Sequence, residues 1–151
     1  MGEGHAVRIT TRTEAGRAAI EATGAECWIG TPERLGTLRA ALESVTIVCW
    51  LLGTVTSRAG SDGEEEVRAL HASRLEFFLG QVIDTTVRGF VYEATGTAPG
   101  DALAEGERTV QRVAERNAIP TALLRAEIED PDVWQAEARA AVDELLGGSP
   151  G

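Results

Sequence analysis

Few side chains in this sequence can carry out covalent or acid–base chemistry. The 151 residues include one tyrosine, Tyr92, two histidines, His5 and His71, and two cysteines, Cys27 and Cys49. All 14 basic residues are arginine, which excludes Schiff-base chemistry, a P-loop lysine and a Tyr-x-x-x-Lys pair. Two distant histidines without a Cys-x-x-Cys pair predict no metal site. No Gly-x-Ser-x-Gly turn indicates a hydrolase.

The cysteines and His71 have structural interpretations. Both cysteines fall inside expected strands, so we interpret them as small buried hydrophobes rather than reactive thiols or a disulfide framework. His71 lies beside the apolar face of an expected helix, which favours a packed or solvated side chain.

Composition and charge limit the classes of protein to which this chain can belong. The length fits one domain, which we place at residues 1–146, with a disordered tail at residues 147–151. The chain has 24 acidic against 14 basic residues and a net charge of −10, so neither nucleic acid nor an anionic membrane is an expected partner. We find no signal peptide and no apolar run long enough for a membrane span, so the cytoplasm is the expected location.

Short apolar strands alternate with amphipathic helices along the chain. This alternation predicts an α/β, Rossmann-like fold with a mostly parallel sheet and helices on both faces. The expected strands are residues 7–11, 26–30, 45–52, 87–92 and 121–125. The run from Val45 to Leu52 is apolar on both faces, which predicts a central strand that is nearly fully buried.

Helix boundaries follow from capping residues. Thr13 is expected to cap a helix that Gly24 ends in a left-handed conformation. One continuous helix is expected to bury apolar residues from Val67 to Val82. A helix from Asp101 to about Arg116 follows, and Asp130-Pro131 caps the last helix. That last helix has one apolar face, which consists of Trp134, Ala138, Ala141, Val142 and Leu145.

The phosphate-binding part of a Rossmann fold is missing. The glycine fingerprint lies between the first strand and the first helix, and the residues before Val7 are too few for that unit. We therefore expect an N-terminally truncated fold. Three arrangements follow: residues 7–11 pair directly with residues 45–52, a second chain fills the gap, or the reading frame begins upstream of Met1.

Several short sequence segments resemble those of the short-chain dehydrogenase/reductase superfamily, especially its atypical NAD(P)-binding members. Their order along the chain, over about residues 4–128, carries the resemblance. The segments begin at Gly4-His5-Ala6-Val7-Arg8 and continue with Thr10-Thr11-Arg12, residues 45–53, Arg88-Gly89-Phe90-Val91-Tyr92 and residues 104–125.

The resemblance implies NADP or NAD as the cofactor. The alternative is that the chain binds no cofactor, because the turn that would bind the pyrophosphate is lost. Arg12 ends the strand that would contact the adenosine ribose and suits a 2′-phosphate, although a solvated strand-end arginine explains it as well. Gly53 would allow close approach of the cofactor, or simply begins a loop. Thr95 falls near the family's catalytic Ser or Thr and is otherwise structural. Tyr92 is followed at the fourth position by Gly96, so no catalytic residue is assigned.

Two functions from different classes remain. The first is a degenerate NAD(P)-binding Rossmann protein, weak or inactive in cofactor binding and catalysis, so whether it is an enzyme is left undecided. The second is a non-enzymatic interaction or oligomerisation module that reuses the fold. A homodimer is expected because a missing helix leaves apolar sheet surface uncovered. The sequence names no substrate or other small-molecule ligand.

Overall fold

The computed structural model describes residues 6–11, 13–31, 35–52, 67–83, 85–96, 100–126 and 129–147. The chain folds as two compact units, Met1–Glu43 and Ser44–Gly151. The expected single domain over residues 1–146 stays a prediction, and residues 148–151 of the expected tail lie outside the described residues.

The first unit is a small parallel βαβ arrangement. Strand β1 (Arg8–Thr11) pairs in parallel with β2 (Glu26–Ile29), from Arg8↔Glu26 to Thr11↔Ile29. Between them lie a 3-10 turn, η1 (Glu14–Gly16), and helix α1 (Arg17–Ala22), and after them come α2 (Leu35–Arg39) and η2 (Ala40–Leu42).

Two capping predictions for this unit have different outcomes. Gly24 has φ of 89°, which confirms the left-handed end of α1. Thr13 makes no side-chain cap hydrogen bond, so that prediction was wrong. The carboxylate of Glu14 instead bonds the guanidinium of Arg17 at 2.7 Å, which ties the turn to α1.

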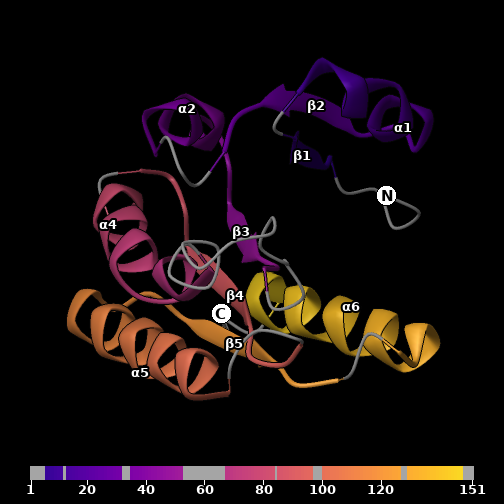
Figure 1. Ribbon diagram of the computed structural model, residues 1–151. Coiled ribbons are helices and arrows are strands. Elements are labelled where there is room, and N and C mark those ends of the chain that lie inside the picture. Colours follow the sequence, from indigo (N-terminus) through magenta and orange to yellow (C-terminus); the bar gives the residue numbers. More distant parts are fainter. Residues whose placement is uncertain are drawn as a thin grey trace. The chain divides into compact units, whose positions relative to one another are not determined.

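The second unit is a three-stranded parallel sheet with helices on both faces. Its strands, in hydrogen-bonding order, are β3 (Ile47–Trp50), β4 (Gly89–Glu93) and β5 (Thr121–Leu124). Helices α4 (Ser73–Val82) and α5 (Gly100–Asn117) lie on one side of the strands, and α6 (Pro131–Gly147) lies on the other (Figure 1). This arrangement confirms the α/β, Rossmann-like fold class.

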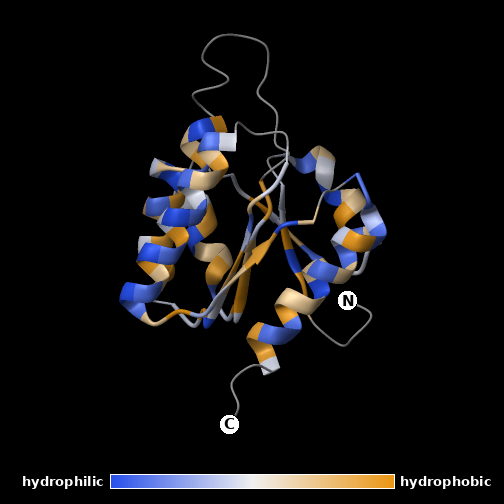
Figure 2. Cartoon of the chain, turned by 90° about the horizontal axis from the view of Figure 1, so that it is seen from below, coloured by the Kyte–Doolittle hydropathy of each residue, from blue (hydrophilic) through white to orange (hydrophobic). Residues whose placement is uncertain are grey.

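The core of this unit has one layer on each face of the sheet. Towards α4, the rings of Trp50 and Phe78 lie 4.8 Å apart, and Phe78 in turn lies 6.5 Å from Phe90. Towards α6, the expected apolar face of that helix packs against Val91 and Leu124. Each helix ribbon carries both hydrophobic and hydrophilic residues, as amphipathic surface helices do (Figure 2).

The expected central strand is an outer strand. Among the described strands, β3 pairs only with β4, and Cys49 and Leu51 in the predicted strand Val45–Leu52 are exposed. β4 occupies the centre, and all five of its residues are buried. A largely apolar run therefore predicted the strand correctly and its position wrongly, because burial on both faces depends on which strands and helices lie beside it.

The expected continuous helix is interrupted at His71 and Ala72. Residues 67–70 are helical, and α4 begins at Ser73. The amides of His71 and Ala72 bond the carbonyls of Arg68 and Ala69, three residues back, so the last turn tightens. Ala72 then takes φ of −132° and ψ of −101°. These angles are not helical, so the helix cannot continue through Ala72.

Candidate functional site at the carboxyl ends of the parallel strands

The three parallel strands of the second unit end at one edge of their sheet. In open α/β sheets, ligands bind outside the carboxyl ends of the strands. These ends are Trp50, Glu93 and Leu124, followed by residues 51–52, 94–96 and 125–126. The side chains that bond these segments form what we call the carboxyl-end cluster: His71, Tyr92, Glu93, Thr95, Trp134 and Glu137.

His71 joins β3 to β4 from inside the core. Its Nδ1 lies 2.6 Å from the hydroxyl oxygen of Tyr92, and its Nε2 lies 3.2 Å from the carbonyl oxygen of Leu52. Both aromatic side chains have an exposed fraction of 0%. The interruption between residues 67–70 and α4 places His71 here. Of the two expected environments, packed or solvated, the structure shows the packed one, with two partners that sequence reasoning did not identify.

The protonation states of this pair follow from its surroundings. Burial lowers the pKa of His71, and burial together with the nearby Glu107 and Glu93 carboxylates raises the pKa of Tyr92. His71 is therefore neutral and Tyr92 is a phenol at pH 7. A carbonyl only accepts, so Nε2–H donates to Leu52, and Nδ1 accepts the Tyr92 hydroxyl proton. Neither side chain has any surface exposed to solvent, so protein atoms enclose the pair.

Gly106 makes room for this pair. It is buried on α5, and a Cβ built there would overlap the hydroxyl oxygen of Tyr92. The Tyr92 hydroxyl also lies 3.4 Å from the carbonyl oxygen of Leu103, one turn earlier on the same helix. The absence of a side chain at Gly106 is therefore what lets α5 approach β4 so closely.

A second group of bonds joins the ends of β4 and β5. The Thr95 hydroxyl donates to the Ala126 carbonyl at 3.0 Å, and the Ala94 amide donates to the Leu124 carbonyl at 2.9 Å. One carboxylate oxygen of Glu137, on α6, accepts from the amides of Arg125 and Ala126. These contacts hold the backbone just beyond both strands in one position.

Glu93 places a carboxylate inside the protein at the end of β4. The residue is 2% exposed, and its Oε2 accepts the indole N–H of Trp134 at 2.9 Å. The available signal for it in the sequence was a charged residue directly after the expected strand at residues 87–92. Glu137 lies three residues after Trp134, the spacing of one helical face, and so reaches the same edge of the sheet.

The three residues predicted to contact a cofactor have separate outcomes. Arg12 and Gly53 lie outside the described residues. Thr95 lies at the expected edge, half-buried, and its hydroxyl proton is engaged by the Ala126 carbonyl. Its role towards a cofactor stays a prediction.

The cysteines differ from their predicted burial. Cys27 is half-buried, and Cys49 is exposed, because β3 is an outer strand. Partial desolvation nevertheless raises the pKa of the Cys49 thiol to about 11, so it is protonated at pH 7. Among the residues described, no group of three or more His, Cys, Asp or Glu side chains could hold a metal ion. No helix in the described part of the chain combines the length and hydrophobicity of a membrane span.

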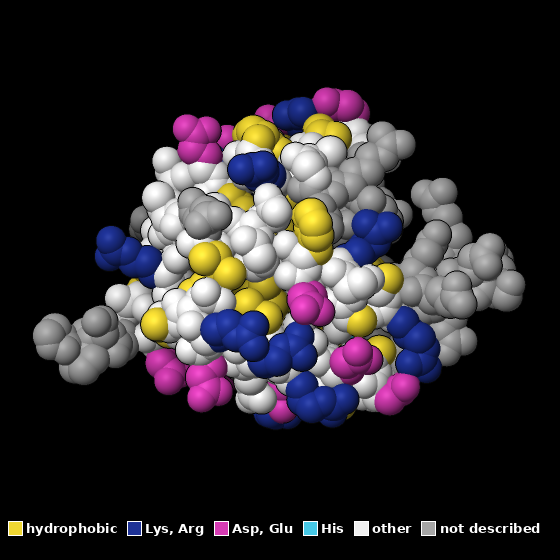
Figure 3. Space-filling view, turned by 90° about the vertical axis from the view of Figure 1, so that its left-hand side faces the viewer, with side chains coloured by type: hydrophobic (Ala, Val, Ile, Leu, Met, Phe, Trp, Pro, Cys, Tyr) yellow, Lys and Arg dark blue, Asp and Glu magenta, His cyan; other side chains and the backbone are white. Residues whose placement is uncertain are grey.

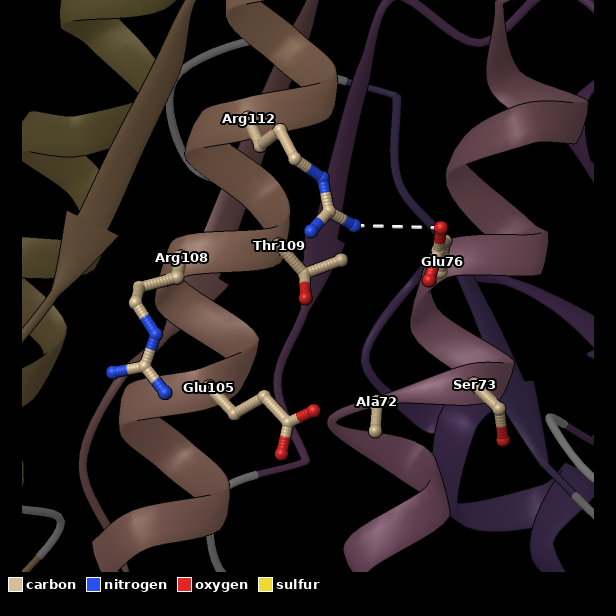
Figure 4. A pocket seen from close by; sticks show the side chains of 7 residues that line it. All are labelled: Ala72, Ser73, Glu76, Glu105, Arg108, Thr109 and Arg112. Carbon is tan, nitrogen blue, oxygen red and sulfur yellow. Dashed lines mark ion pairs between the residues drawn. The ribbon is translucent and has the colours of Figure 1, made fainter.

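A charged groove of about 460 Å³ lies between α4 and α5, and none of the cluster residues lines it. Its walls are Ala72, Ser73, Glu76, Glu105, Arg108, Thr109 and Arg112. Glu76 and Arg112 face each other across it at 3.4 Å (Figure 4). Arginines and carboxylates are interspersed on this side of the molecule (Figure 3). The mixed charges favour no single class of ligand.

The parallel order and the flanking helices agree with solved structures. The protein gox2253 matches with a TM-score of 0.64 and 18% identity over 81% of this chain and 44% of its own. A Citrobacter sp. triphenylmethane reductase complexed with NADP(H) matches with a TM-score of 0.54 and 16% identity, over 78% of this chain and 39% of its own. A short-chain dehydrogenase from Streptomyces avermitilis matches with a TM-score of 0.61 and 14% identity, over 98% and 76%. The fold is Rossmann-like.

These matches define the fold alone, because all three identities are below 20%. No protein-family model and no curated protein matches the chain. The chain spans less than half the length of gox2253 and of the triphenylmethane reductase.

Proposed function

We propose that this chain is an NAD(P)-binding type of Rossmann protein related to atypical short-chain dehydrogenases/reductases. The observation that carries the proposal is the parallel β3–β4–β5 sheet, whose carboxyl ends converge at the edge where this fold binds ligands. A structurally similar reductase holds NADP(H), which supports the same class of ligand here.

We further propose that the chain binds the cofactor weakly and does not catalyse hydride transfer by a Tyr-x-x-x-Lys mechanism. The sequence contains no lysine and no glycine fingerprint for the pyrophosphate. The burial of Tyr92 and its hydrogen bond to His71 support this proposal, because the phenol cannot reach a substrate.

Calorimetric titration of the full chain with NADPH and NADH tests both parts. We expect saturable binding with Kd above about 0.1 mM, a free energy weaker than about −5.5 kcal/mol. Micromolar affinity would contradict the proposed degeneracy. No saturable binding of either nucleotide at millimolar concentration would contradict the NAD(P)-binding assignment.

Arg12→Ala tests the residue proposed for the 2′-phosphate. Its loss should weaken NADPH more than NADH, because only NADPH carries that phosphate. Arg116→Ala, an exposed arginine in the last turn of α5, serves as the matched control and should change neither affinity. Equal losses for both nucleotides would remove Arg12 from this role.

A second candidate function is a protein-interaction or oligomerisation module. The exposed side chains of Cys49, on the outer strand β3, and of Leu51, just after it, favour this function. Oligomeric state, measured without nucleotide, distinguishes this function from the first.

A further inference from the structure

Two consecutive backbone amides beyond β5 converge on one oxygen atom. The amide nitrogens of Arg125 and Ala126 both lie within 3.1 Å of Oε1 of Glu137, on α6. In a regular strand, successive amides point in opposite directions, so they cannot share an acceptor. The chain bends at Ala126, directly after β5, and this bend lets both amides face the same point.

Converging backbone amides are a common anion-binding arrangement in proteins. Successive N–H groups that face one point form a small concavity with positive partial charge, which favours a negatively charged acceptor. The carboxylate of Glu137 is such an acceptor, so its Oε1 stands in for an oxygen of an anionic ligand. The concavity also lies at the carboxyl end of β5, at the edge where open α/β sheets bind ligands.

Bonds to β4 and its following residues also hold this backbone. The Thr95 hydroxyl donates to the Ala126 carbonyl at 3.0 Å, and the Ala94 amide donates to the Leu124 carbonyl at 2.9 Å. These two bonds do not involve Glu137, so they persist when its carboxylate leaves. Every residue of this arrangement belongs to one compact unit, Ser44–Gly151.

The neighbouring charges favour a carboxylate ligand over a phosphate. Glu93, at the same edge, holds its carboxylate on the indole of Trp134, three residues before Glu137. The guanidinium of Arg125 is bound by the carboxylate of Glu107 at 2.8 Å. A phosphate group carries up to two negative charges at pH 7, so these carboxylates repel it more strongly than they repel a singly charged carboxylate.

We propose that the amide pair of Arg125 and Ala126 binds the carboxylate of a small-molecule ligand, and that Glu137 occupies this site until the ligand displaces it. Without ligand, Glu137 satisfies two amides that would otherwise lose their acceptor. With ligand, two hydrogen bonds to Glu137 break and two to the ligand carboxylate form. This inference goes beyond the proposed function and does not depend on NAD(P) binding.

Glu137 acts in this proposal as an intramolecular competitor. A ligand binds only those molecules in which the amide pair is free, so its apparent Kd rises as that fraction falls. If the pair is free in about one molecule in ten, removal of the Glu137 carboxylate lowers the apparent Kd about tenfold. The native chain still binds the ligand, but more weakly than a chain without this carboxylate.

A titration of the full chain with sodium acetate tests the proposal. Nuclear magnetic resonance follows the amide shifts of Arg125 and Ala126, with sodium chloride at the same ionic strength as the reference. Both the native chain and Glu137→Ala should bind acetate saturably, and Kd should be about tenfold lower for Glu137→Ala. Circular dichroism verifies that the variant folds.

Two matched variants separate occupancy from charge. Glu137→Gln has no charge, but its side-chain oxygen can still accept from both amides, so it should bind acetate more weakly than Glu137→Ala. Glu144→Ala removes an exposed carboxylate elsewhere on α6 and should bind acetate like the native chain. Sodium phosphate at the same ionic strength should bind more weakly than acetate in Glu137→Ala.

Several results would overturn the proposal. The absence of saturable acetate binding in Glu137→Ala would exclude the anion site. Binding in Glu137→Ala with no response at all in the native chain would make Glu137 a permanent structural contact. Equal affinities of the native chain and Glu137→Ala, or of Glu137→Gln and Glu137→Ala, would show that occupancy by Glu137 does not oppose the ligand. Tighter binding of phosphate would contradict the carboxylate assignment. None of these results changes the calorimetric test of nucleotide binding.

Discussion

His71 Nδ1 lies 2.6 Å from the hydroxyl oxygen of Tyr92, and neither side chain has any exposed surface. The pair connects the end of β3, through the Leu52 carbonyl, to the middle of the sheet. A buried polar group that loses its partner retains its desolvation cost, so this contact should influence stability strongly.

Tyr92→Phe should destabilise the protein by about 1–3 kcal/mol, because the ring still packs while Nδ1 of His71 loses its donor. Urea denaturation followed by tryptophan fluorescence measures the change. Thr86→Val removes an exposed hydroxyl bond to the Val45 carbonyl and should cost less than about 0.5 kcal/mol. Equal costs for the two variants would mean that the buried bond is not formed in solution.

Gly106→Ala and Gly80→Ala should have opposite effects. A Cβ at Gly106 would overlap the Tyr92 hydroxyl, so we expect a loss of about 1–3 kcal/mol. Gly80 lies in α4 with open space around it, and alanine there should stabilise by about 0.5–1 kcal/mol. Thermal unfolding of the pair measures both, and a stable Gly106→Ala variant would contradict the close approach of α5 to β4.

Stability should fall as the pH drops from about 7 to 5. Burial lowers the pKa of His71 in the folded state, so the unfolded chain binds the proton first. The contribution of neutral His71 to stability is therefore fully present above its pKa in the unfolded chain, near 6.5. It is lost as the pH falls from there through the lower pKa of His71 in the folded protein. A single group gives a slope of at most about 1.4 kcal/mol per pH unit. His71→Gln should flatten this part of the profile, whereas His5→Gln, at the other histidine, should leave it unchanged.

Core substitutions should report the position of each strand in the sheet. Leu124 is fully buried, so Leu124→Ala should cost about 2–5 kcal/mol. Ile47 on the outer strand is half-buried, and Ile47→Ala should cost about 1–2 kcal/mol. Val133→Ala, at a residue 51% exposed on α6, is the control with little expected effect. If Ile47→Ala cost as much as Leu124→Ala in chemical denaturation, β3 would be more deeply buried than an outer strand allows.

Glu137→Ala should release the backbone after β5. The amides of Arg125 and Ala126 would lose their common acceptor, with an expected cost of about 1–2 kcal/mol. Amide hydrogen exchange at these two residues should accelerate. Glu144→Ala, at an exposed position on α6, should leave both rates unchanged. Unchanged rates in Glu137→Ala would show that its carboxylate does not hold this segment.

The sequence by itself determined the fold class and most element positions. Alternating strands and helices predicted parallel strands, and Asp130-Pro131 predicted the start of α6, where Asp130 bonds the Val133 amide at 3.4 Å. The apolar face of α6 was also predicted correctly, from Trp134 to Leu145. These features depend on local spacing and local capping, which are written within a few residues.

Only the tertiary structure decided which strand is central and which polar groups meet. The apolar run of β3 is consistent with either an inner or an outer strand, and the neighbours along the sheet made it outer. His71 and Tyr92 are 21 residues apart, and nothing in their own sequence surroundings predicts a 2.6 Å contact. Strand order and buried polar pairs depend on contacts between distant segments, and local periodicity carries no information about which segments those are.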